Sequence, residues 1–303
     1  MKPLVQVFIA TYNRPTLVLN AVNSVLQQDF SSFEVIVSDN STNDQTESIL
    51  KKISDTRFSF KKRKESLPVI DHLNAILQDV TSDYFMIFHD DDIMNRNLLS
   101  TLYNKITRDS NIIAVGSNAI FIKNGKAKLY NKNLKKDTII TDKNVLIGRY
   151  LIYDIVPFPS YLYCKKVAEK SKFDFNHGGK YCDASFIISL LNYGSILFVA
   201  APLMNYNLHS GQDSSVNDFT QKISLINFYI NNSDYSNKHP LIIRFRIQNI
   251  FVEFLSYLKQ KKFFFFEKRN LKIISLIFKA SPIEYFPRLI YAILKTHTNK
   301  YLK

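Results

Sequence analysis

The chain has 303 residues, 46% of them hydrophobic, which suffices for one large domain or two modest ones and excludes wholesale disorder. Only seven residues are Gly, which argues against long flexible linkers and against a repeat architecture. The formal net charge of +14 favours an anionic partner: nucleic acid, nucleotide phosphates or the anionic face of a membrane.

The first 116 residues alternate between short apolar runs, typical of buried strands, and segments with helical spacing. The spacing is that of βαβ units, so it predicts a mostly parallel sheet with helices on both faces. Expected strands lie at 4–10, 33–38, 57–61, 84–88 and 112–115, and expected helices at 15–26, 46–53, 67–77 and 98–106.

The second half of the chain is less regular. Residues 123–136 are basic and turn-rich, which indicates an exposed loop or hairpin; a helix is expected at 182–193 and a strand at 196–200. From about Phe219 onward, long helical patterns mix Phe, Ile and Leu with Lys and Arg, so we place a boundary near 215–220.

Segments that would direct the chain out of the cytoplasm are not expected. The N-terminal apolar run is short and leads into polar residues, so we interpret it as the first strand rather than a signal peptide. A spanning helix needs about 18 continuous apolar residues, and without such a stretch a soluble or peripheral protein is expected. Two cysteines, Cys164 and Cys182, favour a reducing compartment, and they lack the spacing of a zinc site.

Three polar clusters follow predicted strands: Thr11–Arg14, Asp39–Asn40 and Asp90–Asp92. Ligands bind at the carboxyl edge of open α/β sheets, so three clusters in register favour a binding site there over simple polar turns. The acidic run 90–92 is the sharpest of them, because adjacent carboxylates repel one another unless a cation lies between them. Mg²⁺ and Mn²⁺ prefer such oxygen ligands. An acidic surface turn or a helix N-terminus is the alternative.

Asp39 follows a buried strand and precedes a helix, where a carboxylate often binds a ribose or a base. The alternative is a helix N-cap, a role that Asn40, Ser41 or Thr42 could perform equally well. The sequence contains neither GxGxxG nor a Walker lysine motif, so neither a dinucleotide fold nor a P-loop is supported.

Together, the segments V7-F-I-A-T-Y-N-R-P15, V35-I-V-S-D-N40 and Y84-F-M-I-F-H-D-D-D-I93 resemble family 2 glycosyltransferases with the GT-A fold, of the bacterial surface-polysaccharide type. The resemblance covers roughly residues 3–215. It implies a Rossmann-like α/β sheet and an inverting transfer of a sugar from a nucleotide diphosphate donor, expected to be a UDP-sugar. The acceptor would be a hydroxyl of a glycan or a lipid-linked glycan.

The resemblance also implies roles for particular residues. Mn²⁺ or Mg²⁺ would be held by Asp91 as first choice, with Asp92 and His209. His209 lies in Y206-N-L-H-S-G-Q-D-S214, which resembles a recurrent Tyr-x-x-His-x-x-Gln-x-Ser stretch; a structural or solvated His is the alternative. The nucleotide pocket would be lined by Thr11, Tyr12, Asn13, Arg14, Asp39, Asn40, Asn74 and Asp90.

The catalytic base implied by the resemblance is Asp183. It lies in G178-G-K-Y-C-D-A-S-F-I187, which resembles the segment that commonly carries a Glu-Asp pair; here the pair is Cys182-Asp183. The alternative is an acid that stabilises the start of a helix. His89 adjoins the acidic run and either lines the site or forms a hydrogen bond at the end of the strand.

The expected organisation is a catalytic domain at 1–218, with a nucleotide-binding half at 1–116 and an acceptor-binding half at 117–218. A basic, Phe-rich helical region follows at 219–303. Its helices would lie on an anionic membrane or pack on the catalytic domain or on a second subunit, as in a homo-oligomer. We expect a cytoplasmic protein, peripheral on the inner face of the membrane, with no nucleic acid partner. A metal-dependent nucleotidyltransferase and a non-catalytic glycan- or membrane-binding protein are the alternative functions.

Overall fold

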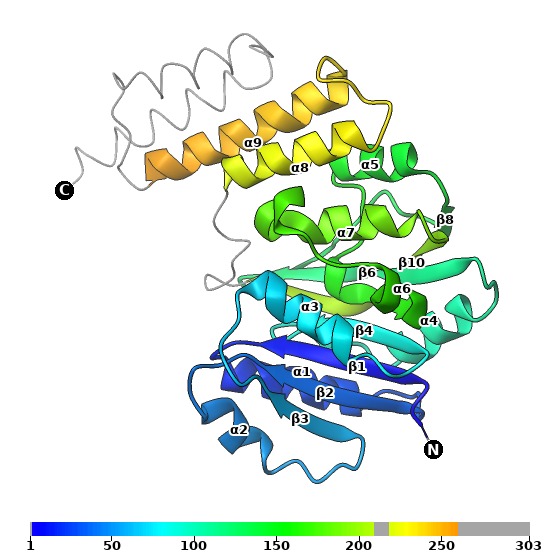
Figure 1. Ribbon diagram of the computed structural model, residues 1–303, viewed down its shortest axis with the longest axis vertical. Helices are drawn as coiled ribbons and strands as arrows, with labels where there is room; N and C mark the ends of the chain where they lie inside the picture. The colour runs from blue at the N-terminus through cyan, green and yellow to red at the C-terminus, as the bar shows by residue number, and fades with distance from the viewer. Residues whose placement is uncertain (1, 209–217, 260–303) are drawn as a thin grey trace. The chain divides into compact units, whose positions relative to one another are not determined.

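The computed structural model describes residues 2–208 and 218–259 (Figure 1). By their contacts the described residues form two compact units. The first takes in the chain up to Phe175 and resumes at Cys182, while the second consists of Asn176–Tyr181 and the helices that follow residue 218. None of the helices in these two stretches is both long and apolar enough to cross a bilayer.

Four parallel strands form the first half of the sheet, as the sequence predicts. They are β1 (Val5–Thr11), β2 (Phe33–Asp39), β3 (Phe58–Lys62) and β4 (Tyr84–His89), in the order β3-β2-β1-β4. The inner strands are almost wholly buried because helices cover both faces, which explains their continuous apolar runs. The helices of this half are α1 (Pro15–Leu26), α2 (Gln45–Leu50), α3 (Val69–Asp79) and α4 (Leu98–Ile106).

The second half of the sheet is mixed. The two long strands β6 (Ile112–Lys123) and β10 (Ser195–Leu208) pair in parallel, and β9 (Tyr161–Cys164) lies antiparallel between β4 and β6. Strand β9 has no counterpart among the strands expected from the sequence. The predicted hairpin is confirmed, since β7 (Lys126–Leu129) pairs with β6. Its turn at Asn124 and Gly125 has positive φ at both residues, 49° and 71°. The short strands β5 (Ile93–Met94) and β8 (Thr138–Ile140) pair with β10.

Helices pack on both faces of the sheet, and Figure 1 shows α3, α6 and α7 on the near face with α1 behind. On the α1 face, alternate residues of β1 join α1 and α4 in one core. On the other face Phe173 and Phe186 stack with ring centroids 4.1 Å apart. The remaining helices are α5 (Lys143–Leu151), α6 (Lys165–Lys170) and α7 (Cys182–Leu190), with 3-10 turns at Phe158–Ser160, Phe175–His177 and Gly179–Tyr181. Helix α7 begins where predicted but ends at Leu190 rather than Tyr193.

The second unit contains α8 (Phe219–Asn231) and α9 (Pro240–Lys259), so the predicted helical character after residue 219 is confirmed for the described residues. The side chain of Asp218 accepts a hydrogen bond from the N–H of Gln221 and thereby caps α8. Tyr229 of α8 packs against Phe245 of α9, with ring centroids 6.1 Å apart. Helix α9 therefore covers the part of the apolar face of α8 that includes Tyr229.

Candidate active site

The three polar clusters meet at one edge of the sheet, as expected from the sequence. Thr11, the last residue of β1, pairs in register with Asp39 at the end of β2. On the other side of β1, Ala10 pairs with His89, so the acidic run begins one residue past that level. Because all three strands are parallel, their carboxyl ends present the clusters side by side.

The loop after β1 contacts the acidic run directly. The Thr11 hydroxyl donates a hydrogen bond of 2.7 Å to Asp90 Oδ2. Arg14 Nη1 lies 3.3 Å from Asp90 Oδ1 and 3.7 Å from Asp91 Oδ2. Pro15 occupies the first position of α1, where its missing N–H costs nothing, and so the helix starts immediately after Arg14. The guanidinium is thereby held next to two carboxylates.

The acidic run itself is buried, and burial raises the pKa of Asp90. Asp92 is fully buried, and burial, followed by the charge of Asp91, raises its pKa well above the usual range. Its Oδ1 accepts a hydrogen bond of 2.9 Å from the N–H of Asn207 on β10. Its Oδ2 has no hydrogen-bond partner among the described residues. Burying a carboxylate oxygen without a partner is costly, so the arrangement favours a bound cation.

A possible donor set for that cation is present. Ligand atoms of His89, Asp91 and Asp92 lie within 4.8 Å of one another, and His89 Nδ1 is 3.8 Å from Asp92 Oδ2. Two carboxylates and an imidazole suit Mn²⁺ or Mg²⁺, the first of which accepts nitrogen ligands more readily. From the sequence alone His89 has no single expected role, and its position directly before the acidic run is the signal that points to the site. His209 lies outside the described residues.

Asp39 lies at the opposite side of the same edge and is fully buried. Its Oδ1 accepts a hydrogen bond of 3.0 Å from the N–H of Ser41, while its Oδ2 has no hydrogen-bond partner among the described residues. A buried acceptor of this kind is ready for a ligand donor such as a ribose hydroxyl or a base N–H. Asn40, by contrast, is occupied by the protein: its side chain exchanges two hydrogen bonds of 2.8 Å with the backbone of Leu67.

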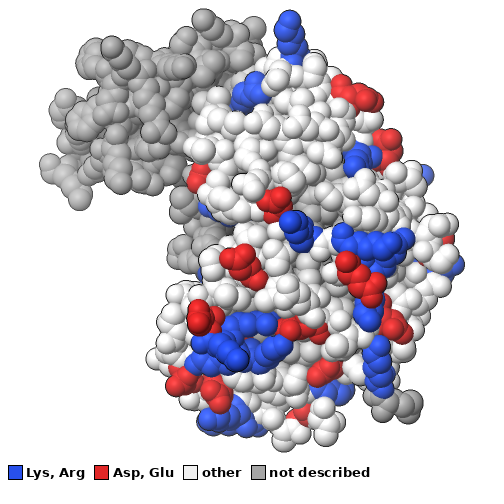
Figure 2. All heavy atoms as spheres, viewed as in Figure 1, with Lys and Arg blue, Asp and Glu red and all other residues white. Residues whose placement is uncertain are grey.

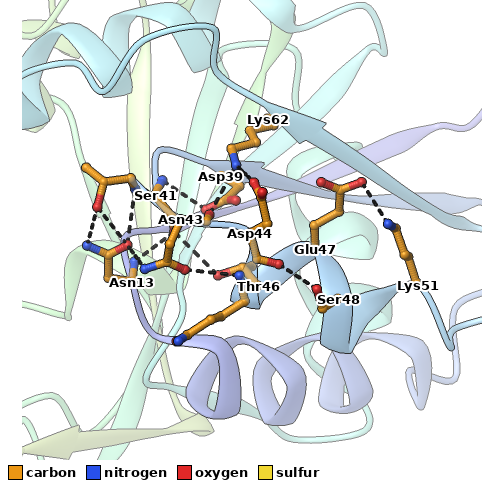
Figure 3. A network of polar contacts seen from close by, with 12 residues as sticks. Asn13, Asp39, Ser41, Asn43, Asp44, Thr46, Glu47, Ser48, Lys51 and Lys62 are labelled. Atoms are coloured by element: carbon orange, nitrogen blue, oxygen red, sulfur yellow. Dashed lines mark hydrogen bonds and ion pairs between the residues drawn. The ribbon is translucent and has the colours of Figure 1, made fainter.

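Asn13 joins the loop after β1 to the loop after β2 (Figure 3). Its N–H donates to Ser41 Oγ at 2.8 Å, and its side-chain oxygen accepts hydrogen bonds from the N–H of Thr42 and from Asn43 Nδ2. Its φ is 54°, a left-handed conformation that Asn tolerates better than most residues. The neighbouring Tyr12 is 50% exposed. Asn13 thus fixes the loop geometry, and Tyr12 offers a free ring face beside it.

Asn74 lies on α3 and Asp183 on α7, and both helices cover the face of the sheet opposite to α1 (Figure 1). The Asn74 side chain exchanges hydrogen bonds of 3.0 and 2.8 Å with the backbone of Phe173, and its place in the nucleotide pocket stays a prediction. Asp183 lies in the first turn of α7 and is half-buried. Burial, followed by the charges of Asp183 and then Asp92, raises the pKa of Tyr130. One phenol therefore lies within electrostatic reach of both carboxylates, which the sequence analysis did not foresee.

The parallel half-sheet with an acidic run after β4, extended by mixed strands, defines the class: a GT-A α/β enzyme. The model of Glycosyl transferase family 2 matches residues 6–168, more than half of the chain, and the chain belongs to this family. It is a glycosyltransferase of glycan biosynthesis.

Two relatives are similar in sequence. An uncharacterized glycosyltransferase of Haemophilus influenzae is 26% identical over 242 residues, which is 76% of this chain and 75% of the relative. The GalNAc(5)-diNAcBac-PP-undecaprenol beta-1,3-glucosyltransferase of Campylobacter jejuni is 29% identical over 153 residues, 49% of each chain.

Two solved structures share the fold. Residues 1–349 of Staphylococcus aureus TarS, in complex with UDP-GlcNAc, superpose with a TM-score of 0.65 at 16% identity, covering 97% of this chain and 88% of that fragment. The mannosyltransferase PcManGT of Pyrobaculum calidifontis, in complex with GDP-Man and Mn²⁺, gives a TM-score of 0.58 at 14% identity, covering 100% and 88%. At these identities the likeness establishes the GT-A fold alone.

Proposed function

We propose that the enzyme transfers a sugar, with inversion, from a UDP-sugar to a hydroxyl of a glycan or lipid-linked glycan, and that its catalytic domain spans residues 1–218. The observation that carries this proposal is a pair of buried carboxylate oxygens at one sheet edge, Asp39 Oδ2 and Asp92 Oδ2, which find no hydrogen-bond partner within the described part of the chain. Asp39 Oδ2 suits a hydrogen bond from the nucleoside, and Asp92 Oδ2 suits a cation beside the diphosphate. The donor found in the TarS complex is consistent with this choice.

The residues divide into a nucleoside side and a diphosphate side. Asp39 would accept a hydrogen bond from the base or ribose, with the exposed ring of Tyr12 nearby. On the other side, His89, Asp91 and Asp92 would hold Mn²⁺ or Mg²⁺, with His209 as a fourth candidate. When bound, this ion would stabilise the charge that develops on the departing nucleotide. Arg14, already beside Asp90 and Asp91, supplies a second positive charge to the same phosphates.

Asp183 would act as the general base. Its carboxylate would take the proton of the acceptor hydroxyl while that oxygen bonds to the anomeric carbon. The bond from the anomeric carbon to the β-phosphate oxygen breaks, and its electron pair leaves with the nucleoside diphosphate. Asp183 suits this role because it comes from α7, whereas the acidic run comes from the end of β4. The base and the leaving group can therefore approach the sugar from different sides.

We further propose that the enzyme works at an anionic membrane surface. The relative from Campylobacter jejuni acts on an undecaprenol-linked acceptor, and residues 260–303 of this chain contribute more than half of its net charge. Over the visible face in Figure 2, basic and acidic side chains lie beside one another. Several basic side chains of the described residues are paired, such as Lys61 and Arg63 with Asp79. The unbalanced positive charge thus belongs mainly to the C-terminal segment, which suits an anionic leaflet.

The function is tested by measuring UDP release from a panel of UDP-sugars with Mn²⁺, together with the melting temperature in the presence of each donor. A donor that binds the folded state should raise the melting temperature by mass action. If every UDP-sugar fails in both measurements while a GDP- or dTDP-sugar succeeds, uracil is not the nucleobase of the donor. Failure of every nucleotide sugar would overturn the proposed reaction itself.

A further inference from the structure

A tight turn directly precedes the helix that carries Asp183. Gly178 has φ 128° and Gly179 has φ 59°, conformations that glycine adopts far more easily than other residues. Both glycines are buried. A Cβ on Gly179 would lie 2.2 Å from Gln221 Oε1, so the side chain of Gln221 occupies the space that this glycine leaves. The turn and Gln221 are therefore fitted to each other.

The Gln221 amide joins the turn to the capping residue of α8. Its Oε1 accepts a hydrogen bond of 2.7 Å from the N–H of Lys180, and its Nε2 donates one of 2.8 Å to Asp218 Oδ2. Asp218 in turn donates its N–H to the Tyr181 hydroxyl at 3.1 Å. We name this set of three residues, Asp218, Gln221 and Tyr181, the turn latch.

A cation reinforces the turn latch. Lys222 Nζ lies 3.6 Å from the centroid of the Tyr181 ring, within the range of a cation–π interaction. The capping bond from Gln221 N–H to Asp218 Oδ1, 3.0 Å long, belongs to α8 itself and does not depend on the Gln221 side chain. The latch amide can therefore be removed while the cap that starts α8 remains.

We propose that Gln221, through the turn latch, is a positioning residue for the general base Asp183; this inference rests on the proposed function. Tyr181 is followed at once by Cys182 and Asp183, the first two residues of α7. The latch fixes the backbone of Lys180 and the ring of Tyr181, and so it fixes the point from which the first turn of α7 departs. A base must hold its oxygen within hydrogen-bonding reach of the acceptor hydroxyl, and a misplacement of about 1 Å costs up to about 10²-fold in rate.

The test is Gln221→Met, which keeps the volume that fills the turn and removes both hydrogen bonds of the amide. We expect kcat to fall about tenfold, with the KM for the donor and the affinity for UDP within about twofold of the wild type. The matched control is Asn227→Ala, an exposed amide on the same helix, which should leave kcat unchanged. Hydrogen exchange at the amides of residues 182–185 should become faster in Gln221→Met alone.

A second pair of variants tests the fitted turn without an activity assay. Gly179→Ala should lower the melting temperature through its clash with Gln221 and through its positive φ. Gly179→Ala combined with Gln221→Ala removes the clash, so the double variant should lose less stability than the two single losses added together. Additive losses would show that the two residues do not contact each other, which overturns the latch.

The outcomes separate the two proposals. If the wild type transfers no sugar, the proposed function fails, while the exchange rates and the double-variant comparison still decide whether the latch exists. If sugar is transferred and Gln221→Met matches Asn227→Ala in kcat and in exchange at residues 182–185, Gln221 does not position the base. A fall in the donor KM and kcat together, with unchanged exchange, would likewise contradict positioning.

Discussion

Asn207 donates two hydrogen bonds to the acidic run, one from its N–H to Asp92 Oδ1 at 2.9 Å and one from its side chain to the carbonyl of Asp91 at 2.7 Å. A residue of β10 thus fixes the orientation of two candidate metal ligands that follow β4. Loss of a group that orients metal ligands in this way typically lowers metal affinity or activity by about 10- to 100-fold.

Replacing Asn207 by Ala should therefore weaken metal binding. The backbone bond to Asp92 can remain, but the bond that holds the Asp91 carbonyl is lost. We expect the Mn²⁺ concentration needed for half-maximal activity to rise about 10-fold or more, with kcat at saturating Mn²⁺ nearly unchanged. Asn205→Ala on the same strand is the control, because among the described residues the side-chain hydrogen bond from β10 to the Asp91 carbonyl comes from Asn207 and not from Asn205. If Asn207→Ala and Asn205→Ala need the same Mn²⁺ concentration for half-maximal activity, Asn207 does not contribute to metal binding.

Removal of the metal should abolish turnover. Asp91 lies in the candidate donor set, and Asp91→Asn exchanges a charged oxygen ligand for a neutral one. Activity should disappear in excess chelator, return with Mn²⁺ or Mg²⁺, and stay absent in Asp91→Asn. Asp71→Asn, at an exposed acid on α3, should behave as the wild type. Full turnover in chelator would rule out the metal-assisted reaction.

The fold of the first half could be predicted from sequence because its order depends on local signals. Each strand is a short apolar run followed by a polar turn and a helical period, and right-handed βαβ units leave few ways to arrange them. Strand β9 could not be predicted in this way. It has only four residues, Tyr161–Cys164, and its place between β4 and β6 depends on pairing with segments distant in the chain.

The site shows a similar limit. Sequence identifies polar side chains at strand ends but not which partners they meet. Asp39 retains a buried oxygen without a described partner, whereas Asn40 beside it is consumed by the backbone of Leu67. The sequence around Asn207 gives only a weak indication of its role, because Asn207 follows Tyr206 in a motif in which His209 was the candidate ligand. Its role depends on how β10 approaches β5, where Asn205 pairs with Ile93.

His72 should make stability depend on pH. The imidazole is buried, and its Nε2 lies 2.7 Å from Ser38 Oγ, which also accepts hydrogen bonds from Arg63. Ser38 therefore donates to a neutral His72. Burial, and then the charge of Arg63, lowers the pKa of His72 from 6.5 to about 4. The unfolded state binds the proton first, so stability is complete above about pH 6.5 and is lost as the pH falls toward 4.

The measurement is the free energy of unfolding between pH 7 and pH 4. His72 should account for a loss of roughly 3 kcal/mol at most across this range. His72→Gln keeps an acceptor for the Ser38 hydroxyl and does not titrate, so its slope with pH should be shallower. His177→Gln, at an exposed His, should keep the wild-type slope. Parallel slopes for all three proteins would show that His72 does not control this transition.

Truncation should release the protein from anionic liposomes. A cut at residue 240 would remove α9 and expose the α8 face that includes Tyr229, so the cut belongs after Lys259. The deleted segment has ten Lys or Arg and two Glu. Each basic residue near an anionic leaflet contributes about 1 kcal/mol. Binding of the full chain to phosphatidylserine vesicles should exceed that of the truncated chain, and both should bind UDP equally. Equal liposome binding by the two would assign the segment to another partner.

Replacing Asp183 by Asn should remove the general base while preserving the shape of the site. Asp183 lies in the first turn of α7, and its charge acts on Tyr130, as that of Asp92 does. An ordinary carboxyl has a pKa of about 4 and is ionised at neutral pH. It can still accept the proton, because the hydroxyl becomes acidic as its oxygen bonds to the anomeric carbon. The expected result is a fall in kcat of about 10²-fold or more, with donor affinity nearly unchanged.

Asp154 is a poor substitute for Asp183 as the base, since Arg149 and Asn131 already bind its carboxylate. Wild-type kcat in Asp183→Asn would place the base elsewhere, with Asp174 and Asp213 tested next. Loss of folding or of donor binding in Asp183→Asn would instead show that Asp183 stabilises the start of α7.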